Sequence, residues 1–88
     1  MGKNFLIAED NGINLDMLKE LLKEEGAACD CAKNGMAAVD LFRHSKKGQY
    51  DLIFMDVQMP DMDGYEATRA IRKMKHPDAK DIPIVAMT

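Results

Sequence analysis

The chain has 88 residues, enough for one small domain, and 47% of them are hydrophobic and 31% charged. This is the composition of a globular protein with a packed core, and it excludes an intrinsically disordered chain. The net charge is -3, with 12 basic and 15 acidic residues scattered along the sequence. The basic stripe of a nucleic-acid-binding protein is therefore missing, and we expect no direct contact with nucleic acid.

The sequence also predicts a cytoplasmic protein. Cys29 and Cys31 stand two apart, too close in a strand for an ordinary disulfide and without the second pair that a zinc site needs. We therefore expect free thiols in a reducing compartment. No apolar run approaches the length of a membrane span, and no signal-peptide core follows the first residues. We expect no membrane contact by this segment.

Four short apolar runs alternate with three stretches in which apolar residues recur at helical spacing. The first and third runs end abruptly in an acidic residue, which is typical of strands buried on both faces. The strands are expected at residues 5–8, 27–32, 52–55 and 84–87. The helices are expected at residues 14–25 before Gly26, from the Asn34-Gly35 turn to about Ser45, and from a cap at Asp63 to Pro77.

Apolar strands separated by helices require crossover connections, because parallel strands cannot be joined by a tight turn. The sequence therefore predicts an α/β fold with a doubly wound parallel sheet that helices cover on both faces. No internal repeat, low-complexity stretch or linker divides the chain, so we expect one domain over residues 1–88.

Polar side chains follow three of the expected strands. Glu9 and Asp10 come after the first strand, Asp56 after the third and Thr88 after the fourth. Because parallel strands end at the same edge of a sheet, we expect these residues to gather there. Three carboxylates would repel one another unless a cation offset their charge. Oxygen ligands without His or Cys favour Mg²⁺ over zinc.

A carboxylate in such a site can also act as a nucleophile toward phosphorus and form an aspartyl phosphate, while a metal ion neutralises the transferring oxygens. The hydroxyl of Thr88 could donate to one of those oxygens. Taken singly, Glu9 and Asp10 fit a helix cap, Asp56 a strand-to-helix turn, and Thr88 a polar residue at a chain end. Their shared edge of the sheet favours the chemical interpretation.

Three stretches of the sequence resemble the receiver domains of two-component signalling proteins. They are residues 6–11, 51–67 and 83–88, and the resemblance covers essentially the whole chain. The run MDVQMPDMDG at residues 55–64 is very specific. The chain is also similar to receivers fused to hybrid sensor histidine kinases, in which Glu-Asp-Asn and Gly-Tyr-Glu-Ala-Thr are common. The resemblance implies the flavodoxin-like receiver fold.

The resemblance also implies a role for each site residue. Asp56 would be the phosphoacceptor, which takes a phosphoryl group from a histidine kinase or a phosphotransfer domain. Asp10 would bind Mg²⁺ directly, Glu9 through water or as a second ligand, and Gln58 through its backbone carbonyl. Thr88 would be the switch hydroxyl, whose movement carries the signal. In a hybrid sensor kinase, the parent would be a protein-histidine kinase.

One departure from the family is large. The family continues with a helix, a fifth strand that carries an essential lysine, and a last helix, whereas this sequence stops at Thr88. Lys80 cannot take the lysine's place, because it precedes the fourth strand. We therefore expect a receiver domain that is incomplete on its C-terminal side, with only the first four strands and three helices. Its exposed fourth strand would invite self-association. Gly64 would only let its loop turn.

Two other functions stay open. A truncated or engineered receiver fragment could act as a structural or assembly unit without phosphotransfer, and the absent lysine favours this alternative. An aspartyl-phosphate hydrolase of the haloacid dehalogenase type resembles the chain in chemistry and fold. That family has an Asp two residues after its nucleophile, where this chain has Gln58. Metal binding without formation of an acyl phosphate would select the structural unit.

Overall fold

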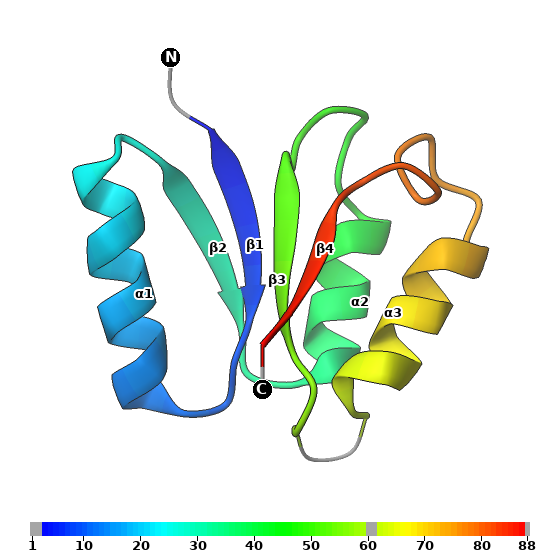
Figure 1. Cartoon of the computed structure of the whole chain (residues 1–88). Helices are drawn as coiled ribbons and strands as arrows, with labels where there is room; N and C mark the ends of the chain where they lie inside the picture. Colours follow the sequence, from blue (N-terminus) through cyan, green and yellow to red (C-terminus); the bar gives the residue numbers. More distant parts are fainter. Residues whose placement is uncertain (1–2, 60–61, 88) are drawn as a thin grey trace.

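The computed structural model describes residues 3–59 and 62–87. Within them, parallel strands form one sheet in the order β2-β1-β3-β4, and helices connect the strands (Figure 1). The strands are β1 (Asn4–Ala8), β2 (Ala28–Ala32), β3 (Leu52–Asp56) and β4 (Ile84–Met87). The helices are α1 (Gly12–Glu24), α2 (Gly35–Arg43) and α3 (Gly64–Lys73). The predicted order of elements and the parallel α/β sheet are confirmed.

Each helix begins at a side chain that caps it. Asn11 caps α1, Asn34 caps α2 and Asp63 caps α3, and each side chain accepts backbone N–H bonds from the first turn. Because Asn11 is a cap, α1 begins two residues before the predicted start at Asn14. Gly26 follows α1 with a φ of 76°, the left-handed conformation in which glycine commonly ends a helix.

All three helices end earlier than predicted, α1 by one residue at Glu24 and the other two by more. The second helix was expected to reach about Ser45, but α2 ends at Arg43, and the Ser45 hydroxyl donates to a carbonyl of the last turn. The third was expected to continue to Pro77, but α3 ends at Lys73 because the next residue, Met74, is extended. Both differences arise at helix ends, where side-chain bonds and local extension compete with further helical turns.

The main core lies between the sheet and the α2–α3 pair. Alternate residues of β1 and β3 point to this side, and they pack against the inner faces of the two helices. The largest fully buried side chains of this cluster are Leu6, Ile53 and Met55 from the sheet, Phe42 from α2 and Ile71 from α3. This packing holds β1 and β3 side by side, and with them the ends at which the acidic residues stand.

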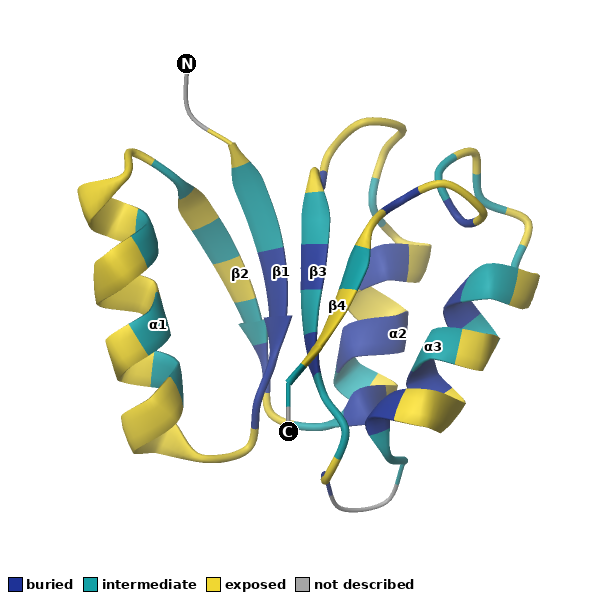
Figure 2. Cartoon of the chain, viewed as in Figure 1, coloured by how far each residue is buried: buried dark blue, intermediate teal, exposed yellow. Residues whose placement is uncertain are grey.

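The other face of the sheet is covered less completely. No residue of α1 is buried, and Figure 2 shows most of α1 and part of β4 as exposed. Ile7 is fully buried, whereas Val85 of β4 is 41% exposed. Within the described residues, the predicted cover on both faces therefore reaches the centre of the sheet but not β4.

Cys29 and Cys31 occupy alternate positions of β2, and both are free thiols that are half-buried. Burial raises the pKa of the Cys31 thiol, and the neighbouring Cys29 adds to this effect. In the part of the chain that the structure describes, no helix combines the length and the apolar character needed to cross a membrane.

A pair of isoleucines tests the position of the core. Ile53 is fully buried, whereas Ile13 is 73% exposed. Ile53→Ala should lower the free energy of unfolding by about 2–5 kcal/mol, because it removes buried contacts and leaves a cavity. Ile13→Ala, the matched control, should change it by less than about 0.5 kcal/mol. Urea unfolding followed by circular dichroism would measure both, and equal losses would contradict the described core.

Candidate functional site

The candidate site lies where β1 and β3 end. From β1 the chain continues to β2, which lies on one side of β1, and then to β3, which lies on the other side of β1. The strand order therefore reverses between β1 and β3, and their ends form the switch point of the sheet. Sheets of this kind open a crevice there because the following connections diverge. The crevice is a cavity of about 350 Å³ lined by Glu9, Asp10, Asn11, Asn14, Asp56, Gln58 and Met87.

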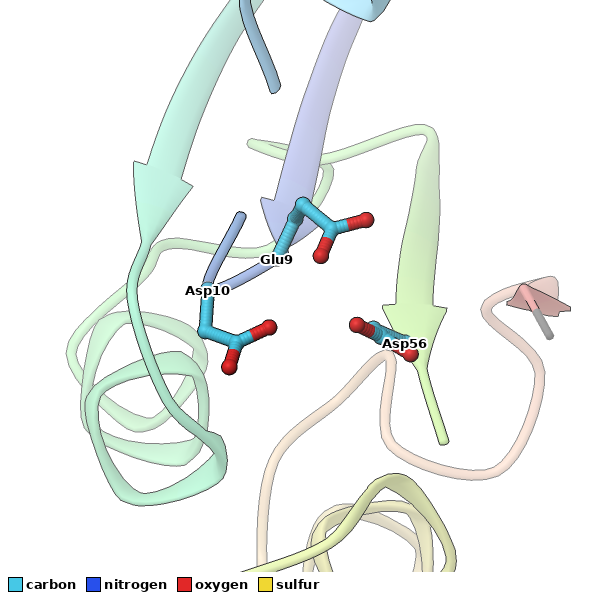
Figure 3. A group of neighbouring side chains, drawn as sticks. All are labelled: Glu9, Asp10 and Asp56. Atoms are coloured by element: carbon cyan, nitrogen blue, oxygen red, sulfur yellow. The ribbon is translucent and has the colours of Figure 1, made fainter. Parts of the chain in front are cut away.

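Three carboxylates meet in this cavity. Glu9 and Asp10 follow β1, Asp56 ends β3, and their side chains point toward one another (Figure 3). One oxygen from each lies within 4.8 Å of the others. Glu9 is only 7% exposed, Asp56 is half-buried and Asp10 is exposed. The structure thus brings together the three carboxylates that the sequence placed at one edge of the sheet.

Backbone hydrogen bonds orient two of these carboxylates. Oδ1 of Asp56 accepts the N–H of Gln58 at 3.0 Å, and Oε2 of Glu9 accepts the N–H of Asn11 at 3.2 Å. The N–H of Glu9 also donates to the carbonyl oxygen of Ala32 at 3.0 Å, which extends the pairing of β1 with β2 by one residue. The cluster is therefore built into the ends of the strands.

The pKa of Glu9 is raised above its ordinary value. Burial is the largest cause, followed by the contact with the Asp56 carboxylate, and the negative charges of Asp56 and Asp10 add to the effect. The N–H of Asn11 acts in the opposite direction. A bound cation would relieve both the repulsion and the cost of burial. Because all three donors are carboxylate oxygens, they fit a hard divalent cation such as Mg²⁺.

The start of α3 packs directly against the backbone of Asp56. The N–H of Gly64 donates to the carbonyl of Val57 at 3.2 Å. A Cβ atom at Gly64 would lie 2.8 Å from the Cα of Val57 and 2.9 Å from the carbonyl carbon of Asp56. Gly64 has no positive φ, so the requirement for glycine comes from space. Gly64 therefore does more than let the loop turn, because it permits α3 to approach Asp56.

Of the two remaining predicted site residues, the structure describes Gln58 and does not describe Thr88. Gln58 is exposed and lines the cavity, whereas Thr88 lies outside the described residues. Asn14 and Met87 also line the cavity, although the sequence pattern did not single them out. Asn14 could have been found from the Asn11 cap, which puts it in the first turn of α1 beside the acidic residues. Met87 ends β4 opposite Asp56, a pairing that requires the register of the sheet.

The family model for the response regulator receiver domain matches residues 5–88. Hybrid signal transduction histidine kinase B of Dictyostelium discoideum is 46% identical over 81 residues, which are 92% of this chain and 4% of that protein. Probable histidine kinase 6 of Oryza sativa subsp. japonica is 48% identical over 75 residues, 85% of this chain and 8% of that protein. The chain thus spans less than a tenth of either relative.

A solved structure is similar over the whole chain. It is the receiver domain of a sensor histidine kinase from Pseudomonas aeruginosa, with a magnesium ion coordinated in its active site cleft. The sequence identity is 33% and the TM-score is 0.89, and the match covers 100% of this chain and 68% of the other. This similarity confirms the receiver fold that the sequence predicted.

Removal of one charge tests the repulsion within the cluster. The folded pKa of Glu9 is raised, so the loss of its proton costs the folded state more than the unfolded state, and stability falls as the pH rises through that pKa. Glu9→Gln removes the negative charge of this side chain and keeps an oxygen that can accept the N–H of Asn11. Because the repulsion is lost and the hydrogen bond is kept, the variant should have a larger free energy of unfolding at neutral pH in EDTA.

The control is Glu20→Gln, which changes an exposed residue of α1. It should alter the free energy of unfolding by less than about 0.5 kcal/mol. Urea unfolding in the same buffer would compare the variants with the unmodified chain. A Glu9→Gln variant that is less stable than the unmodified chain would contradict the described repulsion among the three carboxylates.

Proposed function

The chain belongs to the response regulator receiver domain family of two-component signalling, and on that premise we propose that it takes a phosphoryl group onto Asp56. The donor would be a phosphorylated histidine of a histidine kinase or of a phosphotransfer domain. The observation that carries the proposal is the meeting of Asp56 with Glu9 and Asp10 at the switch point of the sheet. Such a cluster supplies a nucleophile and a cation site within one cavity.

Asp56 would act as the nucleophile. The N–H of Gln58 holds the carboxylate by its Oδ1 atom at the edge of the cavity. A carboxylate oxygen would attack the phosphorus and form a P–O bond, while the P–N bond to the donor histidine breaks and the ring nitrogen leaves with the electron pair. The product on this chain would be an aspartyl phosphate.

Asp10, Glu9 and Asp56 would hold Mg²⁺ with their carboxylates, and Gln58 would add its backbone carbonyl. A bound Mg²⁺ offsets the negative charge of the carboxylates and of the phosphoryl oxygens. The magnesium ion in the related Pseudomonas aeruginosa receiver supports this assignment. Thr88 directly follows β4, whose Met87 pairs with Asp56. Its hydroxyl would donate to a phosphoryl oxygen and so act as the switch.

The named relatives suggest the setting in which this module works. Because they are histidine kinases that this chain matches over a small part of their length, we propose that residues 1–88 serve as one receiver unit of a cytoplasmic phosphorelay. A parent protein of the hybrid type would be a protein-histidine kinase. With a net charge of -3, the segment would contact protein partners rather than nucleic acid or a membrane.

Intact-mass spectrometry tests the proposed acceptor. The chain incubated with Mg²⁺ and acetyl phosphate should gain the mass of one phosphoryl group, because the small donor can enter the open cavity. Asp56→Asn should abolish the gain, whereas Asp81→Asn, an exposed control, should retain it. Chelation of Mg²⁺ with EDTA should also abolish it.

A gain that persists in Asp56→Asn would contradict the proposal. No gain in the unmodified chain, together with measurable Mg²⁺ binding, would select the alternative of a structural unit that keeps its metal site without phosphotransfer.

We also propose that the 88-residue polypeptide self-associates through β4. Among the described residues, β4 pairs with β3 alone and its other edge is open, and Val85 is 41% exposed. Open edges of this kind tend to pair with another chain. Sedimentation velocity at micromolar concentration should therefore detect a species larger than one chain.

Val85→Lys should shift the population toward monomer, because a charged residue on an edge strand opposes pairing. Leu41→Lys, which changes an exposed residue of α2, is the control and should not. A single monomeric species of the unmodified chain would contradict this proposal.

A further inference from the structure

Two helices of this fold begin with a glycine after an asparagine cap, but the two glycines have different surroundings. Gly12 follows Asn11, and a Cβ atom there would meet nothing within 4 Å. Gly35 follows Asn34, and a Cβ atom there would lie 3.1 Å from the carbonyl carbon and from the Cβ of Met62, and nearer still to the carbonyl oxygen. Neither glycine has a positive φ. The need for glycine at position 35 therefore comes from a contact.

This contact joins the start of α2 to the loop that follows the proposed phosphoacceptor. Between Asp56 and α3, the described residues of the loop are held in two places: Met59 is buried in the core, and Met62 packs against the core and against Gly35. Gly64, the first residue of α3, packs against the backbone of Asp56. The position of this loop relative to the acidic cluster therefore depends on how closely it approaches α2.

We propose that Gly35 is a positioning residue for the site at Asp56. Because it lacks a side chain, it lets the backbone of Met62 close against the first turn of α2, and so keeps Gln58 at the edge of the cavity. This inference rests on the proposed function, since Gln58 would supply a carbonyl to the cation and its N–H holds Asp56.

A methyl group at position 35 has no simple way to be accommodated. Two of the three atoms it would meet belong to the backbone of Met62, and the backbone cannot rotate away as the end of a flexible side chain can. The close packing of protein interiors transmits such a displacement. Gln58 lies in the same loop and would shift with it. A misplacement of 1 Å at a reactive site lowers the rate on the order of 100-fold.

The test compares three variants at a temperature at which circular dichroism shows each of them folded. Gly35→Ala adds a methyl group at the contact, and Gly12→Ala adds the same group at the same helix position in open space. Ile71→Val removes a methylene group from the core and so controls for a general loss of stability. Isothermal titration calorimetry would measure Mg²⁺ affinity, and intact-mass spectrometry would measure the rate of labelling by acetyl phosphate.

Gly35→Ala should weaken Mg²⁺ binding by roughly tenfold or more and slow labelling, whereas the two controls should stay within about twofold of the unmodified chain. If Gly35→Ala resembles either control, the inference is overturned and the proposed function stands. If the unmodified chain neither binds Mg²⁺ nor accepts a phosphoryl group, the proposed function fails, and the inference fails with it.

A measurement on the unmodified chain decides the question if Gly35→Ala does not fold. Mg²⁺ titration of the isotope-labelled chain, followed by nuclear magnetic resonance, should move the amide resonances of Gly35 and Met62 together. Gly48, which lies in the loop before β3 and has nothing within 4 Å of its Cβ position, is the reference that should not move. A Gly35 resonance that stays fixed while those of the acidic cluster move would overturn the inference.

Discussion

The repulsion among three carboxylates at the end of the sheet is the constraint on which the rest of the structure depends. The parallel arrangement imposes it, because β1 and β3 are neighbours and end at the same edge. The burial of Glu9 makes this repulsion costly, and burial and repulsion together raise the pKa of the Glu9 carboxyl. The backbone N–H groups of Gln58 and Asn11 donate hydrogen bonds to one oxygen of Asp56 and one oxygen of Glu9, but these bonds do not cancel the negative charge of the carboxylates. A group of this kind opposes folding by itself and favours the binding of a cation.

Close backbone packing gives this cluster its fixed shape. Gly64 allows α3 to approach the backbone of Asp56, and Gly35 allows α2 to approach the same loop. On the inner side of β3, Met55 is buried in the core beside the α2–α3 pair. The backbone of Asp56 and the loop that follows it therefore contact α3 and α2 at points that leave no room for a methyl group. A scaffold of this kind can hold reacting groups in place without long, flexible side chains.

The sequence predicted the elements that depend on local pattern, apart from the exact helix ends, and it missed what depends on contacts between distant segments. The strand before Asp56 could be recognised as a short apolar run that ends in an acid, and its carboxylate could be placed beside that of Asp10 because parallel strands share an edge. The start of α1 was missed because the sequence pattern at Asn11 is typical both of a turn and of a helix cap. The contact of Gly35 with Met62 joins residues far apart in the sequence, and it leaves no periodic signal. The roles that the resemblance implied for the site residues stay predictions.

Whether the acidic cluster takes a hard divalent cation is tested most directly by the dependence of stability on Mg²⁺. Thermal unfolding of the unmodified chain would be measured over a series of Mg²⁺ concentrations, with NaCl adjusted to keep the ionic strength constant. An ion that binds the folded chain alone raises the Tm progressively once its concentration exceeds Kd. We expect this rise in the unmodified chain and a much smaller one in Asp10→Asn. A Tm that is the same in Mg²⁺ and in NaCl of equal ionic strength would contradict the assignment of the cluster as a cation site.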